Sequence, residues 1–288
     1  MHESKRVVPW FLGITVVISW PLFLSSLWYP QLALVAWTLA MFAPGIAAII
    51  TTRLIARESL GTLRLGRLGP KRYYLWALLV PPALSVVALL FTVILGAGEF
   101  DPTLSLVRQS LPEGFEQGPI PLELIVAAQA LAAILLGSLI NTIPAMGEEL
   151  GWRGFLLPRL MYLGKWRAIV LSNVIWGLWH APAILQGHNY PETPVLGVFL
   201  MVGFCLLIGI FLSWVYLATR SPWAPALGHG ALNASAALPL LFLRPGVNIT
   251  FGGTLASLSG WIGMILFAIW LVGTRRLDVT EQISSSEE

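Results

Sequence analysis

The sequence has few charged residues and almost no cysteine. Asp, Glu, Lys and Arg together make up 11% of its 288 residues, less than half of the roughly one-quarter share found in soluble domains. This scarcity excludes a soluble enzyme and a disordered polar protein. Cys205 is the only cysteine and lies within an apolar run, which excludes an intrachain disulfide and a CxxC site. We expect Cys205 to be a buried packing residue.

Hydrophobic sequence takes the place of the missing charge. Hydrophobic residues make up 57% of the chain, and a bilayer-spanning helix needs roughly 20 mainly apolar residues. The apolar runs are long enough for about eight such helices. We therefore predict an all-α integral membrane protein with spans at residues 9–28, 31–55, 73–95, 122–143, 166–185, 195–218, 225–243 and 255–272.

These spans predict a simple domain organisation. Residues 1–8 are expected to form a cytoplasmic N-terminus, residues 9–273 a single transmembrane domain, and residues 274–288 a polar cytoplasmic tail. The first span follows two basic residues, as a signal peptide does. It is longer than a signal peptide and lacks a clear small-residue cleavage site, so we expect it to be retained.

The distribution of basic residues predicts the orientation in the membrane. With the N-terminus inside, 15 of the 17 Lys and Arg residues fall in inside segments, and only Arg108 and Arg244 fall outside. Cytoplasmic loops carry this excess, so we predict a multi-pass protein of the cell membrane with both termini in the cytoplasm. The outside loop 98–118 is acidic. Tryptophans expected near the membrane interfaces are Trp10, Trp28, Trp166 and Trp223.

Ionisable residues are rare near the predicted spans, and one that lies inside a membrane is a candidate for function. The first group is Glu148-Glu149-Leu150-Gly151-Trp152-Arg153, after the fourth span. On a continuing helix Glu149 and Arg153 can pair, whereas Glu148 points about 100° away and stays available for acid–base chemistry. Taken alone, this group is explained more simply as a solvated loop at the membrane edge.

Two histidines lie within later spans. His180 follows Trp176 by four residues, so the indole can support one side of the imidazole. His229 precedes Asn233 by four residues, which places both on one helix face. Each position alone is explained by hydrogen-bonded packing between helices. All of them together indicate a shared site. The remaining histidines are assigned to solvent: His2 and His188.

These residue types suit hydrolysis of a peptide bond. A carboxylate and an imidazole can polarise a water molecule for attack on a carbonyl, and a second imidazole with an amide can stabilise the oxyanion. No GxSxG motif is present. Alternatively, Glu148, His180 and His229 could bind zinc, although the chain lacks HExxH and the three residues fall on separate helices. The residues alone leave both mechanisms open.

Three motifs, in order along the chain, resemble those of a known family. The run from Glu148 to Arg153 resembles EExxxR, Trp176 to His180 resembles FxxxH, and His229 to Asn233 resembles HxxxN. Together they resemble the CPBP family of intramembrane proteases, also called the CAAX protease and bacteriocin-processing or Abi family. The resemblance covers residues 143–235. The chain departs from the commonest pattern at Trp176, where Phe is usual.

The resemblance implies a fold, an activity and residue roles. It implies about eight transmembrane helices around a polar catalytic cavity that opens toward the cytoplasm. It also implies that Glu148 and His180 activate water, that His229 and Asn233 form the oxyanion site, and that the remaining motif residues support them. It favours a glutamate mechanism without a metal cofactor. The supporting residues are Glu149, Arg153 and Trp176.

Two other functions remain open at this point. The first is a non-enzymatic bacteriocin self-immunity protein with the same fold, and the second is a proton-coupled transporter. The complete motif set favours the protease over the first, and the absence of an internal repeat disfavours the second. The expected partners of the protease are the lipid bilayer and a membrane-associated or lipidated peptide or protein, processed as a CAAX substrate or matured as a peptide. No motif indicates nucleic-acid binding.

Overall fold

The described part of the chain is helical. The computed structural model describes residues 2–112 and 119–278. Within these ranges it contains no β-strand, only an isolated bridge between Phe100 and Leu243. The predicted all-α class is therefore confirmed. Part of the acidic loop predicted at 98–118, and most of the tail predicted at 274–288, lie outside the described residues.

The first half of the chain contains three long helical stretches. The label η denotes a short 3-10 or π helix. Pro81 and Pro82 within α4 are buried, whereas Pro9 and Pro21 within α1 are exposed. The elements are α1 (His2–Ser25), η1 (Pro30–Leu32), α2 (Ala33–Ala40), α3 (Ala43–Ile50), η2 (Thr51–Ile55), η3 (Leu60–Leu63), α4 (Arg72–Ile94), α5 (Ser105–Ser110), α6 (Leu122–Ala132) and η5 (Ala133–Gly137).

The second half of the chain carries the three sequence motifs. The elements are α7 (Ser138–Glu149), η6 (Leu150–Leu156), α8 (Leu157–Leu160), η7 (Met161–Leu163), α9 (Lys165–Trp179), α10 (Ala181–Ile184), α11 (Pro194–Thr219), α12 (Trp223–Ser235), η8 (Leu238–Phe242) and α13 (Leu258–Gly273).

Five helical stretches of the described chain are long and apolar enough to cross a membrane, and a shorter apolar helix, α13, lies at the eighth predicted position. The long stretches correspond to the first, second, third, fourth and sixth predicted spans. The fourth continues well past its predicted end because α6 to η7 join without a break. The five stretches are Arg6–Ser25, Pro30–Ile55, Arg72–Ile94, Leu122–Leu163 and Pro194–Thr219.

The fifth and seventh predicted spans are shorter than expected, so the count of eight is not confirmed. Helix α9 has 15 residues and α12 has 13, which at about 1.5 Å per residue is less than the roughly 30 Å of a hydrocarbon core. Pro182 and Pro239 lack the N–H needed to extend these helices. The chain bends at His180 into α10, and it turns into η8 after α12. Both histidine motifs therefore lie on short helices.

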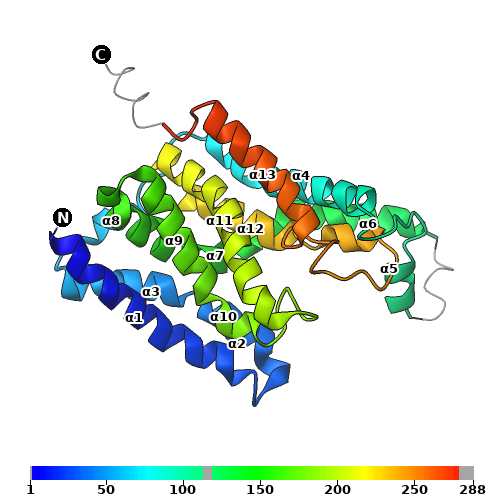
Figure 1. Ribbon diagram of the computed structural model, residues 1–288, viewed down its shortest axis with the longest axis horizontal. Coiled ribbons are helices and arrows are strands. Elements are labelled where there is room, and N and C mark those ends of the chain that lie inside the picture. Colours follow the sequence, from blue (N-terminus) through cyan, green and yellow to red (C-terminus); the bar gives the residue numbers. More distant parts are fainter. Residues whose placement is uncertain (1, 113–118, 279–288) are drawn as a thin grey trace.

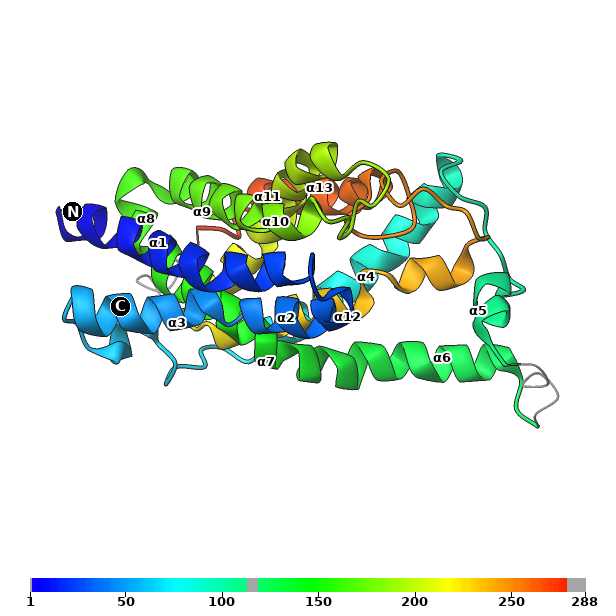
Figure 2. The ribbon, with the colours of Figure 1, turned by 90° about the horizontal axis from the view of Figure 1, so that it is seen from below.

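The short helices lie in the middle of the bundle. Helices α1, α2 and α3 form one side and α4 and α13 the other, with α7, α9, α11 and α12 between them (Figure 1). The beginning of α1 and α8 lie at one end of the molecule, and α5 and the beginning of α6 lie at the opposite end (Figure 2). Because α12 packs against both α7 and α4, its His229 is enclosed by other helices.

Several single-residue predictions can be compared directly with the structure. Cys205 is fully buried in the core, as predicted. His188 is exposed and its ring makes an edge contact with Trp37. The four tryptophans expected at membrane interfaces are all exposed, which suits rings that contact lipid and headgroups. These are Trp10, Trp28, Trp166 and Trp223.

Candidate active site

Glu149 lies between two basic side chains in the centre of the bundle. Its Oε1 accepts a hydrogen bond of 2.7 Å from Arg153 Nη1 and lies 2.9 Å from His229 Nδ1. All three side chains are almost completely buried. The pairing predicted between Glu149 and Arg153 is confirmed, and its burial contradicts a solvated loop. The contact between Glu149 and His229 joins α7 to α12.

Glu148 has different partners because it points away from Glu149. Its Oε2 accepts hydrogen bonds from two indole N–H groups, at 2.6 Å from Trp176 Nε1 and at 3.3 Å from Trp152 Nε1. Its Oε1 has no hydrogen-bond partner within the described residues. Only 1% of Glu148 is exposed. One carboxylate oxygen is thus held in place while the other remains available.

His180 lies where α9 ends. Its Nδ1 is 2.9 Å from the carbonyl oxygen of Trp176, one turn earlier. A carbonyl can only accept, so Nδ1 carries the proton and Nε2 of the neutral ring is left as an acceptor. The rings of Trp176 and Trp179 make edge contacts with the imidazole, at centroid distances of 5.7 and 4.8 Å. The predicted support of His180 by Trp176 is therefore present.

Trp176 contacts the other members of the group. Its indole N–H bonds to Glu148 and its carbonyl oxygen bonds to His180. Its ring meets the ring of His229 at a centroid distance of 5.4 Å, and the Arg153 guanidinium lies over the ring at 4.3 Å. The three motifs converge on this one side chain. From sequence we expected only its contact with His180.

Asn233 stands apart from this buried network. It lies one turn after His229 on α12, as predicted, but its side chain is exposed and forms no hydrogen bond within the described residues. The structure therefore places Asn233 on the same helix as His229 without joining it to the other site residues.

Two polar contributors were not predicted. Asn173 accepts a 2.8 Å hydrogen bond from Arg153 Nη2 through Oδ1, and its own amide donates to the carbonyl oxygen of Ile169. Trp152 is the second donor to Glu148. A signal for Asn173 was present in the sequence, because a polar side chain two helical turns before His180 lies in an apolar stretch. The donor role of Trp152 depends on the tertiary structure.

A close approach of α7 and α12 brings the carboxylates to His229. A Cβ atom at Gly230 would lie 2.5 Å from the carbonyl oxygen of Ser138 and 2.7 Å from the amide nitrogen of Thr142, both on α7. No side chain fits at that distance, so a glycine is required here. The residue after His229 thus determines how near its helix comes to Glu149.

The residues predicted as an alternative zinc set do not form one here. No group of three or more His, Cys, Asp or Glu side chains within residues 2–112 and 119–278 is placed to hold a metal ion. The Nδ1 atoms of His180 and His229 and Oε2 of Glu148 have protein partners, so Nε2 of each ring and Oε1 are the atoms left for a metal, and no three such residues in the described chain are placed around one point. The arrangement of these side chains does not fit a shared zinc site.

Comparison with known proteins gives a match for the central part of the chain. No curated protein matches the sequence. Residues 127–235 match a family model described as "Type II CAAX prenyl endopeptidase Rce1-like". The matched segment begins within α6, ends with α12 and contains every candidate site residue. The resemblance expected from the three motifs is therefore confirmed: this segment matches a family of CAAX prenyl endopeptidases.

Proposed function

We propose that the protein is an intramembrane endopeptidase that hydrolyses peptide bonds with a water molecule activated by Glu148 and His180. The observation that carries this proposal is the arrangement around Trp176, which holds one oxygen of Glu148 and orients His180. It leaves one carboxylate oxygen and one imidazole nitrogen free to accept protons. If Glu148 and His180 had only a structural role, both carboxylate oxygens and both imidazole nitrogens would be expected to have protein partners.

Water activation requires an acceptor for the proton that leaves the water. Either Oε1 of Glu148 or Nε2 of His180 can accept it, since neither atom has a hydrogen-bond partner within the described residues. The hydroxide formed attacks the carbonyl carbon of the scissile bond. The same proton then passes to the departing amine as the C–N bond breaks, so the site returns to its starting state.

The tetrahedral intermediate carries a negative oxygen that needs donors. We assign this role to Nε2 of His229 and the amide of Asn233. Glu149 contacts Nδ1 of His229, so a doubly protonated ring would have its counter-charge in place and would present Nε2–H to the oxyanion. Asn233 is exposed and unbonded, which leaves its amide free for a substrate. Arg153 holds Glu149 in position from the other side.

We infer that the substrate is a membrane-associated or lipidated peptide or protein, of the CAAX type. Glu148 is buried among helices, five of which are long enough to span a bilayer. A substrate that is itself held at the membrane reaches such a site more readily than a soluble protein does. The family description names prenylated CAAX proteins as the substrate class of the relatives.

We further propose that both chain ends face the cytoplasm of a cell membrane. The support is the distribution of Lys and Arg, with 15 of 17 on the predicted inner side. Attachment of a reporter enzyme to each end, active only in the cytoplasm, tests this orientation. Activity at only one end would contradict it.

The function is tested by comparing the termini of membrane proteins in cells that carry the wild type or Glu148→Gln at equal expression. Glutamine keeps an acceptor for the two indole N–H groups and removes the carboxylate, so the variant is expected to fold. Defined membrane-proximal fragments should disappear. Glu123→Gln is the matched control because Glu123 is 57% exposed and lies on α6, away from the site.

Unchanged termini with a folded, inserted Glu148→Gln variant would contradict the peptidase. Immunity to a bacteriocin that survives this substitution would then favour the non-enzymatic alternative. A pH-dependent flux altered by the substitution, without any change in termini, would favour the transporter.

A further inference from the structure

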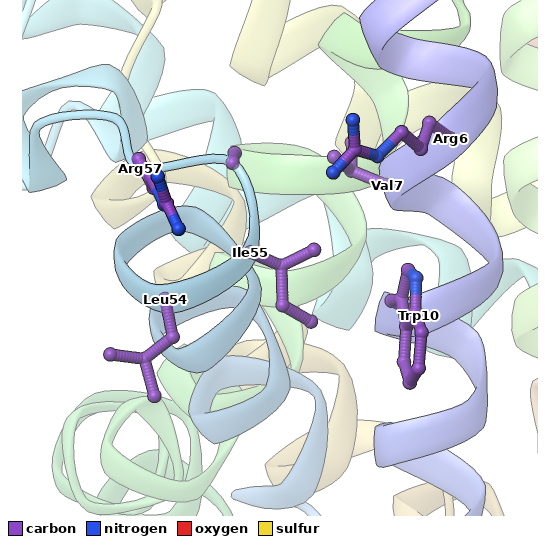
Figure 3. Close-up of a pocket in the computed structure, with 7 residues that line it drawn as sticks. Arg6, Val7, Trp10, Leu54, Ile55 and Arg57 are labelled. Carbon is purple, nitrogen blue, oxygen red and sulfur yellow. The ribbon is translucent and has the colours of Figure 1, made fainter.

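A cavity lies away from the candidate active site, between α1 and η2. Its volume is about 920 Å³ and its lining contains two arginines, Arg6 and Arg57, with apolar side chains between them. None of the lining residues belongs to the three motifs. Figure 3 shows Arg6 and Trp10 extending from α1 toward η2, and Ile55 extending from η2 toward α1.

The cavity is located at the boundary between membrane and water. One membrane-spanning stretch begins at Arg6 and the next ends at Ile55. Helix α1 packs against α2 and α3, so the beginning of the first stretch and the end of the second lie at the same end of the bundle. A bilayer that covers the apolar parts of both helices therefore places the two guanidinium groups at headgroup level.

The two guanidinium groups have no acidic partner within the described residues. The acid that follows Arg57 in the sequence, Glu58, pairs instead with Arg159 at a distance of 2.5 Å. Arg57 also adopts a left-handed backbone conformation, with φ of 57°, which is uncommon for a residue with a side chain. Two unpaired cations beside one cavity favour an anionic ligand.

The remaining lining suits a molecule with an apolar part. Trp10 and Leu54 are 57% and 69% exposed, and together with Ile55 they form an apolar wall directly below the arginines along both helices. Indole rings prefer the level between headgroups and acyl chains. A free anion would use only the arginines, whereas a lipid would use both parts of the cavity.

We propose that this cavity binds one anionic phospholipid. Its phosphate contacts Arg6 and Arg57, Trp10 lies beside its glycerol region, and its acyl chains follow Leu54 and Ile55. This assignment is independent of the proposed peptidase activity, because the ligand is a membrane lipid and the binding residues are outside the catalytic group. The basic loop that follows η2 contributes a general attraction to the anionic surface, whereas the cavity provides a defined site.

Lipid binding to the full-length protein in detergent, measured by native mass spectrometry, tests the proposal. The two probes are phosphatidylglycerol and phosphatidylcholine with identical acyl chains. We expect one phosphatidylglycerol to bind preferentially. Arg6→Gln combined with Arg57→Gln should weaken its binding by about 25-fold, since each basic residue near an anionic headgroup contributes roughly a fivefold factor.

Arg53→Gln is the matched control. Arg53 lies on η2 and is exposed, but it does not line the cavity. The control should retain the preference for phosphatidylglycerol, and both variants should unfold at the wild-type temperature, which separates loss of the site from loss of the fold.

Four results would overturn the proposal. Equal binding of the two lipids to the wild type would exclude a headgroup site, and undiminished phosphatidylglycerol binding to the double variant would place it elsewhere. Displacement of the lipid by equimolar inorganic phosphate would show a simple anion site. An altered KM for an acidic peptide, with lipid binding unchanged, would assign the cavity to a peptide.

Discussion

The indole nitrogen of Trp176 donates a 2.6 Å hydrogen bond to Oε2 of Glu148, which lies 28 positions earlier in the sequence. This single contact links the first and second motifs. Because the backbone carbonyl oxygen of Trp176 also binds His180, the orientation of Glu148 and His180, the two residues proposed to activate water, depends on one residue. The predictions below follow from this network and from the packing that brings it together.

Replacement of Trp176 by Phe should reduce peptidase activity by about 10- to 100-fold. The ring is retained while one hydrogen bond to a charged acceptor is lost, a contribution of about 1.5–3 kcal/mol. Initial rates of cleavage at saturating substrate measure the effect. Trp214→Phe is the control, because Trp214 is also buried and its Nε1 has no hydrogen-bond partner in the described structure. Equal losses in both variants would indicate a packing effect.

Replacement of Arg153 by Met should lower the free energy of unfolding by about 3 kcal/mol. Loss of one partner from a buried ion pair costs about 3–5 kcal/mol, and the lower end applies because His229 still contacts Glu149. Denaturant-induced unfolding in detergent measures it. Arg244→Gln is the control, because the side chains of Arg244 and its partner Glu99 are 67% and 74% exposed. Its free energy of unfolding should change by no more than about 1 kcal/mol. Similar losses in the two variants would contradict the assigned difference.

Replacement of Gly230 by Ala should destabilise the protein by about 1–3 kcal/mol and reduce activity further than stability alone explains. The added methyl group would overlap the backbone of α7 and move α12 away from Glu149. Thermal unfolding and cleavage rates are compared. Gly13→Ala is the control, since nothing lies within 4 Å of a Cβ at that helical position. It should leave stability unchanged or raise it slightly.

Acidification should weaken the loop before α5 through Asp101. Hydrogen bonds from the side-chain hydroxyls of Ser105 and Thr103 lower the pKa of Asp101 in the folded protein. A carboxylate with a lowered folded pKa stabilises the fold above its unfolded pKa of about 3.9, and this contribution declines as the pH falls through the folded value. The melting temperatures of the wild type and Asp101→Asn should therefore differ at pH 6, and the difference should shrink progressively as the pH falls below about 4. A difference that does not change with pH would contradict this explanation, and Glu99→Gln serves as the exposed control.

Chelation of metal ions should leave the peptidase activity intact. The proposed water activation uses a carboxylate and an imidazole, and the described His, Cys, Asp and Glu side chains form no metal-binding group. Cleavage rates before and after phenanthroline treatment, together with metal analysis of the purified protein, test this. Activity that is lost on treatment and restored by zinc would support the zinc alternative at Glu148, His180 and His229.

The sequence alone determined the membrane class, most of the long helices and the contacts between neighbours on one helix. Glu149 and Arg153 pair as predicted because residues four apart share a face of any helix. The same periodicity placed Trp176 beside His180. These features depend on local backbone geometry and on apolar length, both of which can be read directly from the order of residues.

Only the tertiary structure decided which helices supply partners to the carboxylates. The contact between Glu149 and His229 joins positions 80 apart, and it depends on the close packing that Gly230 allows. The lengths of α9 and α12 were also beyond prediction, because apolar residues continue past the bends after His180 and Ser235. Apolar patterning specifies that a segment is buried, whereas the packing of neighbouring helices determines where that segment ends and which polar groups meet.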